Sequence, residues 1–250
     1  MLLDTYESRQ DSSGEEKKEL IKGFNESNST EVLIAALNEE QGVGLTIDEI
    51  SKNIDPSNIL VIDGHSRDRT AEIAKDHGAG IVFQDGKGKG DAIAKAIECI
   101  HPKSHFVVLT DADYTYPAEY LPKMIQILKH NPQVGMVCGN RFNGQVDNKA
   151  LHTQFYFGNL LLALAHNLLN GVELKDPLTG LRVIRAEILR NWKVKSKGFD
   201  IEVELNHQVN KKGFTTVEVP IRYRPRIGEK KLKISDGAAI LKRILLETLH

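Results

Sequence analysis

The sequence has little of what marks secreted, membrane-spanning or nucleic-acid-binding proteins. Its 250 residues include two cysteines, Cys99 and Cys138, far apart and without metal-site spacing, so we expect reduced thiols of a cytosolic protein. We find no charged-then-apolar leader and no apolar run long enough for a bilayer, so we expect a chain that can touch a membrane but does not cross it. A formal net charge of −1 gives no electrostatic case for nucleic acid as a partner.

What is present is the composition of a soluble globular protein, 40% hydrophobic and 27% charged. Residues 1–29 are polar and aperiodic, which predicts a disordered tail before a domain over 30–234 and an amphipathic C-terminal helix over 235–250. Short apolar runs then alternate with helical patterns, which predicts an α/β fold: a mostly parallel sheet with helices on both faces. Strands are expected at 32–37, 59–62, 81–83, 106–109, 134–137, 181–184 and 216–223, and helices at 47–53, 70–77, 91–100, 120–130, 153–169, 200–211 and 237–249.

Two aspartates, Asp111 and Asp113, flank Ala112 directly after the apolar run 106–110. A run of this kind is typical of a buried strand, and open α/β folds bind ligands at the carboxyl ends of such strands. A carboxylate pair there is costly without a cation, and a hard divalent ion bridging a diphosphate is the usual partner. The alternative is a polar strand end followed by a turn.

Three other expected strands also end in polar residues. Asn38 and Glu40 follow the first, Asp63 follows the second, and the Gly/Lys loop 86–90 follows the third. Asp63 is suited to accept the imide hydrogen of a base, or it only closes the turn. The loop is suited to phosphate, although it lacks the Walker and Gly-x-Gly-x-x-Gly patterns, and a solvated loop is the alternative. Four such strand ends in a row favour a nucleotide-diphosphate site.

Taken together, these motifs resemble the family 2 glycosyltransferases of the GT-A (Rossmann-like) fold, and among them the dolichyl-phosphate mannose and glucose synthases. The resemblance runs over roughly 32–232 and includes the segments 36–40, 61–70, 88–92, 111–113, 139–142, 176–182, 197–205 and 226–232. The chain departs from the family pattern where Ala35 replaces proline, Gly64 an aspartate, His65 a glycine and Lys230 a serine.

The resemblance implies an inverting transfer of a hexose from a nucleotide sugar to a polyprenyl (dolichyl) phosphate, supplying lipid-linked sugar for glycosylation. GDP-mannose is the favoured donor, ahead of UDP-glucose and UDP-N-acetylglucosamine. The resemblance also implies a peripheral place at the cytoplasmic face of a membrane, with a membrane-anchoring partner as an option. The apolar helix over 158–169 and the C-terminal helix are candidates for lipid contact, and a core helix is the alternative for the former.

The resemblance also implies which residues form the site. Mg²⁺ or Mn²⁺ is assigned to Asp111, Asp113 and Glu202. The nucleotide sugar is assigned to Ala36, Asn38, Glu40, Asp63, Lys89, Asp111 and Ala112. The acceptor or diphosphate phosphates are assigned to Arg141, Arg226 and Lys231, and the catalytic roles to Asp113, Arg141 and Asp176. Asp176 is expected to orient Arg182 or the acceptor, or to cap a turn. Mannose synthases carry a further basic residue after the Arg141 position, where this chain offers only Lys149 and His152.

Two other functions are compatible with parts of the pattern. A sugar-phosphate nucleotidyltransferase also combines an α/β sheet, a Gly/Lys loop and paired aspartates, but its basic loop normally follows the first strand, where Asn38 and Glu40 stand here. A non-catalytic nucleotide-binding subunit is the third possibility. The complete set of Asp111, Asp113 and Glu202 argues against it.

Overall fold

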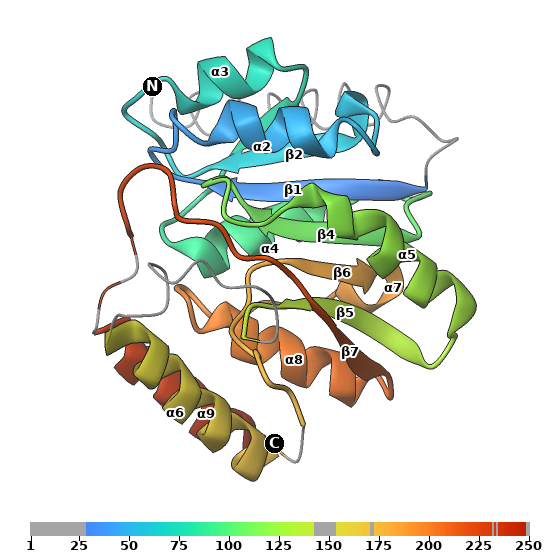
Figure 1. Ribbon diagram of the computed structural model, residues 1–250, viewed down its shortest axis with the longest axis vertical. Helices are drawn as coiled ribbons and strands as arrows, with labels where there is room; N and C mark the ends of the chain where they lie inside the picture. Colours follow the sequence, from blue (N-terminus) through green and yellow to red (C-terminus); the bar gives the residue numbers. More distant parts are fainter. Residues whose placement is uncertain (1–28, 143–153, 171–172, 232, 234, 249–250) are drawn as a thin grey trace, which may run out of the picture.

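The computed structural model describes residues 29–142, 154–170, 173–231, 233 and 235–248, with only the backbone for 154–160 and 170 (Figure 1). The predicted tail over 1–28 and the residues Lys149 and His152 lie outside this range. Ser29, expected in the tail, is already attached to the sheet, because its carbonyl accepts hydrogen bonds from the backbone N–H of His105 (2.8 Å) and Phe106 (3.1 Å).

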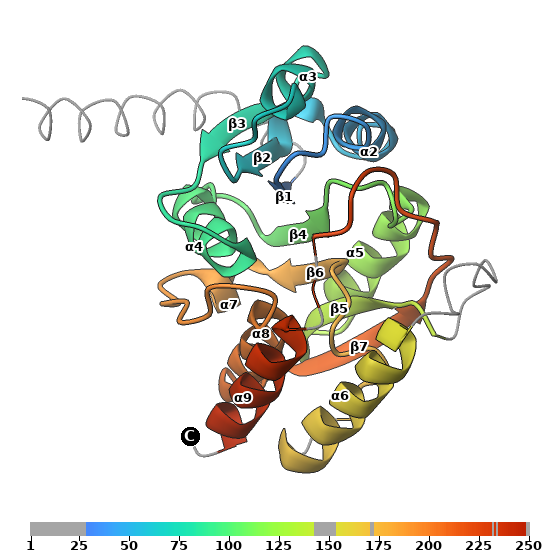
Figure 2. The ribbon, with the colours of Figure 1, turned by 90° about the vertical axis from the view of Figure 1, so that its left-hand side faces the viewer.

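A seven-stranded sheet forms the centre of the molecule, in the order β3-β2-β1-β4-β6-β5-β7 (Figure 2). Among the described residues its strand pairs are parallel except those of β6, which is antiparallel to β4 and to β5. The predicted α/β architecture with a mostly parallel sheet is therefore confirmed. The strands are β1 (Thr30–Ala36), β2 (Ile59–Asp63), β3 (Gly80–Phe83), β4 (Phe106–Asp111), β5 (Val134–Asn140), β6 (Arg182–Arg185) and β7 (Thr215–Pro220).

Helices cover both faces of the sheet, as the alternating pattern predicted (Figure 2). They are α2 (Val43–Ile50), α3 (Thr70–Asp76), α4 (Lys89–Cys99), α5 (Leu121–His130), α6 (Gln154–Asn170), α7 (Ala186–Leu189), α8 (Ile201–Lys211) and α9 (Asp236–Thr248), with short 3₁₀ turns η1 (Pro56–Asn58) and η2 (Ala118–Tyr120). The sequence predicted α2 to start later, and it did not predict α7, η1 or η2. Glycine usually marks a turn, but Gly44 is buried inside α2.

Side chains along β1 point alternately to the two faces of the sheet, so they pack into two separate core layers. Val32 and Ile34 pack with residues of α2, α3 and α5 on one face, while Leu33 packs with residues of α4, α7 and α8 on the other. Because successive side chains of a strand point to opposite faces, a continuous apolar run fills both layers at once. This burial fixes β1 in the middle of the sheet, with its carboxyl end at the edge that carries the polar motifs.

α6 and α9 form a further layer outside α8 (Figure 2). Ile240 and Ile244 of α9 pack with Val203 of α8, and Leu162 and Ala165 of α6 pack against the same cluster. Within the described parts of the chain, no helix is both long enough and apolar enough to cross a membrane.

Candidate functional site

The carboxyl ends of β3, β2, β1 and β4 meet at one edge of the sheet, as the order of the motifs predicted. β1 lies between β2 and β4, with Ala36 opposite Asp63 and Ala35 opposite Asp111. The side chains of Ala36 and Ala112, both predicted to contact the donor, are buried in the core layer under α2. Only their backbone atoms can therefore face a ligand at this edge.

Asp63 is buried at the end of β2, and its two carboxylate oxygens differ. Oδ1 accepts a hydrogen bond from the backbone N–H of Ser66 (2.7 Å). Oδ2 is buried without a hydrogen-bond partner in the described structure. A buried acceptor left unpaired is costly, so this oxygen is a place where a ligand N–H would be stabilising. The hydrogen bond to Oδ1 matches the interpretation that Asp63 closes the turn. The unpaired Oδ2 matches the interpretation that Asp63 binds a base.

Asn38 and Glu40, both predicted to bind the nucleotide sugar, hold the loop that follows β2. The Oδ1 atom of Asn38 accepts from the backbone N–H of Arg67 (2.8 Å). A carboxylate oxygen of Glu40 accepts from the backbone N–H of Arg69 (3.1 Å). In this structure their side chains thus shape the rim of the site by joining the ends of β1 and β2.

The glycines of the loop before α4 allow a second backbone segment to come close. A Cβ on Gly88 would lie 2.3 Å from the carbonyl oxygen of Lys197, and one on Gly90 would lie 2.3 Å from that of Ser196. The backbone N–H of Gly90 donates to the Lys197 carbonyl (3.1 Å). These glycines thus permit close approach of the segment before α8, and the predicted approach to phosphate stays a prediction. That approach brings the first turn of α8 next to Lys89.

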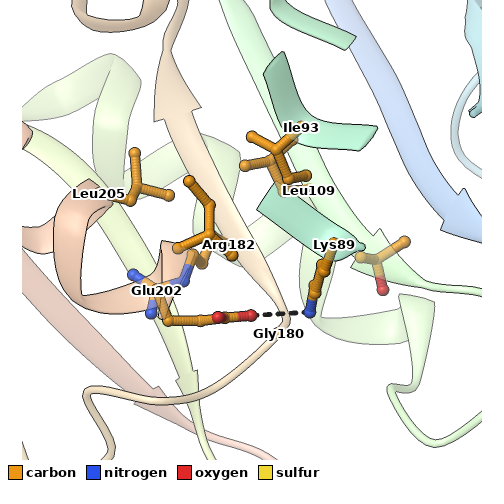
Figure 3. A pocket seen from close by; sticks show the side chains of 9 residues that line it. Lys89, Ile93, Leu109, Gly180, Arg182, Glu202 and Leu205 are labelled. Carbon is orange, nitrogen blue, oxygen red and sulfur yellow. Dashed lines mark ion pairs between the residues drawn. The ribbon is translucent and has the colours of Figure 1, made fainter. Parts of the chain in front are cut away.

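Lys89 lies between two carboxylates. Its Nζ atom is 2.7 Å from Asp111 Oδ1. It is also 2.7 Å from Glu202 Oε1, the ion pair drawn in Figure 3. Burial alone would lower the pKa of the ammonium, but the two carboxylates outweigh it and hold the pKa well above its usual range. Lys89 and Glu202 line a small cavity of about 20 Å³, close to the space of one water molecule.

Asp111 and Glu202 together fit a divalent cation. Their carboxylates come from different elements and converge on one positive charge, and Glu202 Oε2 is buried with no hydrogen-bond partner in the described structure. Hard oxygen donors of this kind suit Mg²⁺ or Mn²⁺. Asp113 does not join them here, and no group of three His, Cys, Asp or Glu residues in the described ranges is arranged around a metal position. The three-ligand site therefore stays a prediction.

Asp113 faces Arg226 instead. Nη1 of Arg226 donates to Asp113 Oδ2 (2.5 Å), and Nη2 of the same guanidinium donates to Glu39. Thr115 donates twice to the other oxygen of Asp113, from its backbone N–H (3.2 Å) and its hydroxyl (2.6 Å). Burial, with Asp111 nearby, raises the pKa of Asp113. Arg226, predicted to bind phosphate, is thus the counter-ion of two buried carboxylates.

Glu39 is a site residue that the sequence analysis did not assign. Burial raises the pKa of its carboxyl to about 7, while Arg226 and Lys231 act in the opposite direction. Its Oε2 atom is buried without a partner among the described residues. The sequence feature that could have identified Glu39 as a site residue is its place between Asn38 and Glu40 at the end of the first strand.

The segment after β7 returns across the sheet to this edge (Figure 1). Along the way the backbone N–H of Ile227 donates to the Asp113 carbonyl (3.3 Å). Lys231 then reaches the loop after β1, where its Nζ donates to the Asn38 carbonyl (3.1 Å). These contacts bring Arg226 and Lys231 over the ends of β4 and β1, close to the predicted donor residues.

Arg141 lies at the end of β5, bound to Asp176. Its backbone N–H (3.0 Å), Nε (2.7 Å) and Nη2 (2.7 Å) all donate to that carboxylate. The guanidinium also lies over the ring of Tyr223, 5.5 Å from its centre. Burial by itself would lower the pKa of Arg141, but Asp176 outweighs it and raises the pKa.

Asp176 therefore orients Arg141, which was not among the roles predicted for it. Arg182, the predicted partner, binds elsewhere: its buried guanidinium donates to Asn206 Oδ1 (2.6 Å), the Pro177 carbonyl (2.7 Å) and the Thr179 carbonyl (3.0 Å). Arg182 thus joins the 176–180 loop to α8.

A model described as glycosyl transferase family 2 matches residues 31–192. The chain belongs to this family. A dolichyl-phosphate hexose transferase of Haloferax volcanii is 34% identical over 86% of this chain and 91% of the relative. A dolichol-phosphate mannosyltransferase of Pyrococcus furiosus is 27% identical over 81% of this chain and 58% of the relative. Among solved structures, glucosyl-3-phosphoglycerate synthase from Mycobacterium tuberculosis with Mg²⁺ and UDP has a TM-score of 0.69 at 20% identity, covering 93% of this chain and 82% of that chain.

Membership of glycosyl transferase family 2 confirms the resemblance found in the motifs and the prediction that the chain is an enzyme. The structural likeness confirms the GT-A fold. The family match and the hexose-transferase relative favour a glycosyltransferase over a sugar-phosphate nucleotidyltransferase.

Proposed function

We propose that this chain transfers a hexose, with inversion, from a nucleotide sugar to a polyprenyl or dolichyl phosphate. The observation that carries the proposal is one sheet edge with two kinds of charge: carboxylates suited to a metal diphosphate, and arginines suited to a second phosphate. The names of the two archaeal relatives, both dolichyl-phosphate sugar transferases, support the acceptor class.

The two halves of the site are physically connected. Arg141 lies against the ring of Tyr223, and the backbone N–H of the next residue, Arg224, donates to the Thr115 carbonyl (3.0 Å). Thr115 in turn donates to Asp113 (2.6 Å). A phosphate on Arg141 would thus lie next to the groups that face the donor, as a transfer between two bound substrates requires.

A phosphate acceptor removes the need for a strong general base. With a second pKa near about 6, a phosphate monoester is largely dianionic at neutral pH and already nucleophilic. What the protein must supply is positive charge that holds two anionic substrates together. Arg141 grips the acceptor phosphate in this proposal, with Asp176 fixing the plane of its guanidinium. Arg226 and Lys231 attract the diphosphate at the ends of β4 and β1.

Asp111 and Glu202 would hold Mg²⁺ or Mn²⁺, with Asp113 as the third ligand. When bound, such an ion neutralises the charge that develops on the leaving nucleoside diphosphate. Asp63, through its unpaired Oδ2, would accept the imide hydrogen of the base. GDP-mannose is the first donor to test, followed by UDP-glucose and UDP-N-acetylglucosamine.

The polyprenyl acceptor also places the enzyme at a membrane, and we propose the cytoplasmic face. α6 exposes Leu161, Leu164 and Leu168, the last with 75% of its surface accessible. α9 exposes Leu241 and Leu245 beside them in the outer layer. Large exposed apolar side chains on neighbouring helices are typical of lipid contact. Replacing Leu164 and Leu168 by Ser should reduce flotation with polyprenyl-phosphate vesicles, with Leu45→Ser on α2 as the matched control.

The decisive experiment incubates the purified chain with a panel of UDP- and GDP-sugars and a short polyprenyl phosphate, and identifies the lipid product by mass. We expect a polyprenyl-phosphate hexose from one donor. A matched control is Asp76→Asn, an exposed carboxylate at the end of α3, which should behave as the parent. Transfer to a soluble phosphate ester with none to the lipid would contradict the proposed acceptor.

A further inference from the structure

The ammonium of Lys89 takes the place between Asp111 and Glu202 that suits a divalent cation. Its Nζ atom is 2.7 Å from an oxygen of each carboxylate, whereas the only other oxygen of Glu202, Oε2, has no hydrogen-bond partner in the described structure. Two anions that meet one cation leave little room for a second positive charge, because like charges a few ångströms apart repel strongly in a buried place.

Packing fixes the backbone segments that carry Lys89 and Glu202. The Lys89 side chain is 14% exposed, and that of Glu202 is 8% exposed. Behind them, the glycine loop packs directly on the backbone of residues 196–198, so the first turns of α4 and α8 are fixed side by side. The ring of Phe199 lies 5.9 Å from the ammonium. The flexible part of the arrangement is the lysine side chain, with its four-carbon stem.

We propose that Lys89 and the divalent cation exclude each other at Asp111 and Glu202, so that Lys89 sets the metal affinity of the site. Without the donor, Lys89 offsets one of the two negative charges of Asp111 and Glu202 and keeps metal affinity low. When the cation arrives with the nucleotide, Lys89 leaves the carboxylates and its charge becomes available to the diphosphate. This inference rests on the proposed function, from which it takes the metal and the donor.

The proposal predicts that removing the Lys89 charge strengthens metal binding, which a purely structural role of Lys89 does not predict. If Lys89 only supports the fold, Lys89→Met disturbs Asp111 and Glu202 and weakens metal binding. If Lys89 competes with the metal, the same variant binds the metal more tightly, because the two carboxylates lose their counter-ion and keep their positions. The two interpretations thus predict opposite changes in one measured constant.

The test uses the full chain without nucleotide and follows free Mn²⁺ by electron paramagnetic resonance. We expect the dissociation constant of Mn²⁺ to be about tenfold lower for Lys89→Met than for the parent. The matched control is Lys129→Met, an exposed lysine in the last turn of α5, which should leave the constant unchanged. An unchanged or higher dissociation constant for Lys89→Met would overturn the inference.

Two further measurements keep the result clear. If Lys89→Met does not fold, Lys89→Gln removes the charge but keeps a hydrogen-bond donor, with the same expectation. In the parent protein, Mn²⁺ should raise acetylation of Lys89, read by peptide mass, while Lys129 stays constant. No such rise when Mn²⁺ is bound also overturns the inference. A different result would count against the proposed function itself: no binding of Mn²⁺ by the parent protein even when UDP or GDP is present.

Discussion

Arg141 and Asp176 are joined by three hydrogen bonds across 35 residues of sequence. The carboxylate takes the backbone N–H at the end of β5 and one edge of the guanidinium. This uses two of the five guanidinium N–H donors, so the rest of the fork can bind a phosphate. The pair thus converts a flexible cation into an oriented one.

Arg141→Ala should mainly affect the acceptor. We expect the KM for polyprenyl phosphate to rise at least about tenfold, which corresponds to the loss of one charge-assisted contact. The KM for the nucleotide sugar should stay nearly constant. Steady-state kinetics with each substrate varied in turn would measure both. Arg69→Ala, which removes an exposed ion pair with Glu72 on α3, is the control. An effect confined to the donor would show that Arg141 belongs to the other half of the site.

Asp113→Ala should abolish transfer while the protein still folds. Preorganised charge at a developing anion contributes about 10²–10³ in rate, so we expect a loss of at least about 100-fold. The same loss is expected for the parent protein in excess chelator, with recovery on adding Mg²⁺ or Mn²⁺. Thermal unfolding followed by circular dichroism checks the fold. Full activity of the variant, or of the parent in chelator, would contradict the metal mechanism.

Glu39 makes stability depend on pH. Burial raises its pKa from 4.5 to about 7, so between these values the folded protein holds a proton that the unfolded chain has released. The free energy of unfolding therefore falls as pH rises through this window. Glu39→Gln cannot release that proton, so its stability should fall less than that of the parent. Urea unfolding at several pH values measures the difference. The free energy of unfolding of Glu187→Gln, an exposed position on α7, should change with pH as that of the parent does. The same pH dependence for Glu39→Gln would refute the raised pKa assigned to Glu39.

Gly90→Ala tests the contact between the loop before α4 and the segment before α8. The added Cβ would lie 2.3 Å from the Ser196 carbonyl oxygen, and backbone cannot move aside cheaply. We expect a loss of about 1–3 kcal/mol in the free energy of unfolding by urea. In Gly237→Ala the Cβ would have nothing within 4 Å, so this α9 variant should gain up to about 1 kcal/mol. Equal effects at both positions would contradict the packing argument.

The local sequence pattern was enough to predict the strands and the sheet edge at which they end. The buried run before Asp111 and the alternation of strand with helix predicted a parallel sheet, and the strand order confirms that β3, β2, β1 and β4 are neighbours. The start of α2 was missed because a buried glycine in a helix looks like a turn in sequence. α7 was missed because its four residues are too few to show a helical period.

The sequence alone determined which residues stand at the carboxyl edge, because residues that follow parallel strands must meet there whatever else the chain does. Only the tertiary structure decided which charges pair. Arg226 reaches Asp113 across 113 residues and Glu39 across 187, and Lys89 faces Glu202 because glycines let two backbone segments touch. Such partners depend on how helices and returning segments pack, and neither hydrophobic period nor motif spacing carries that information.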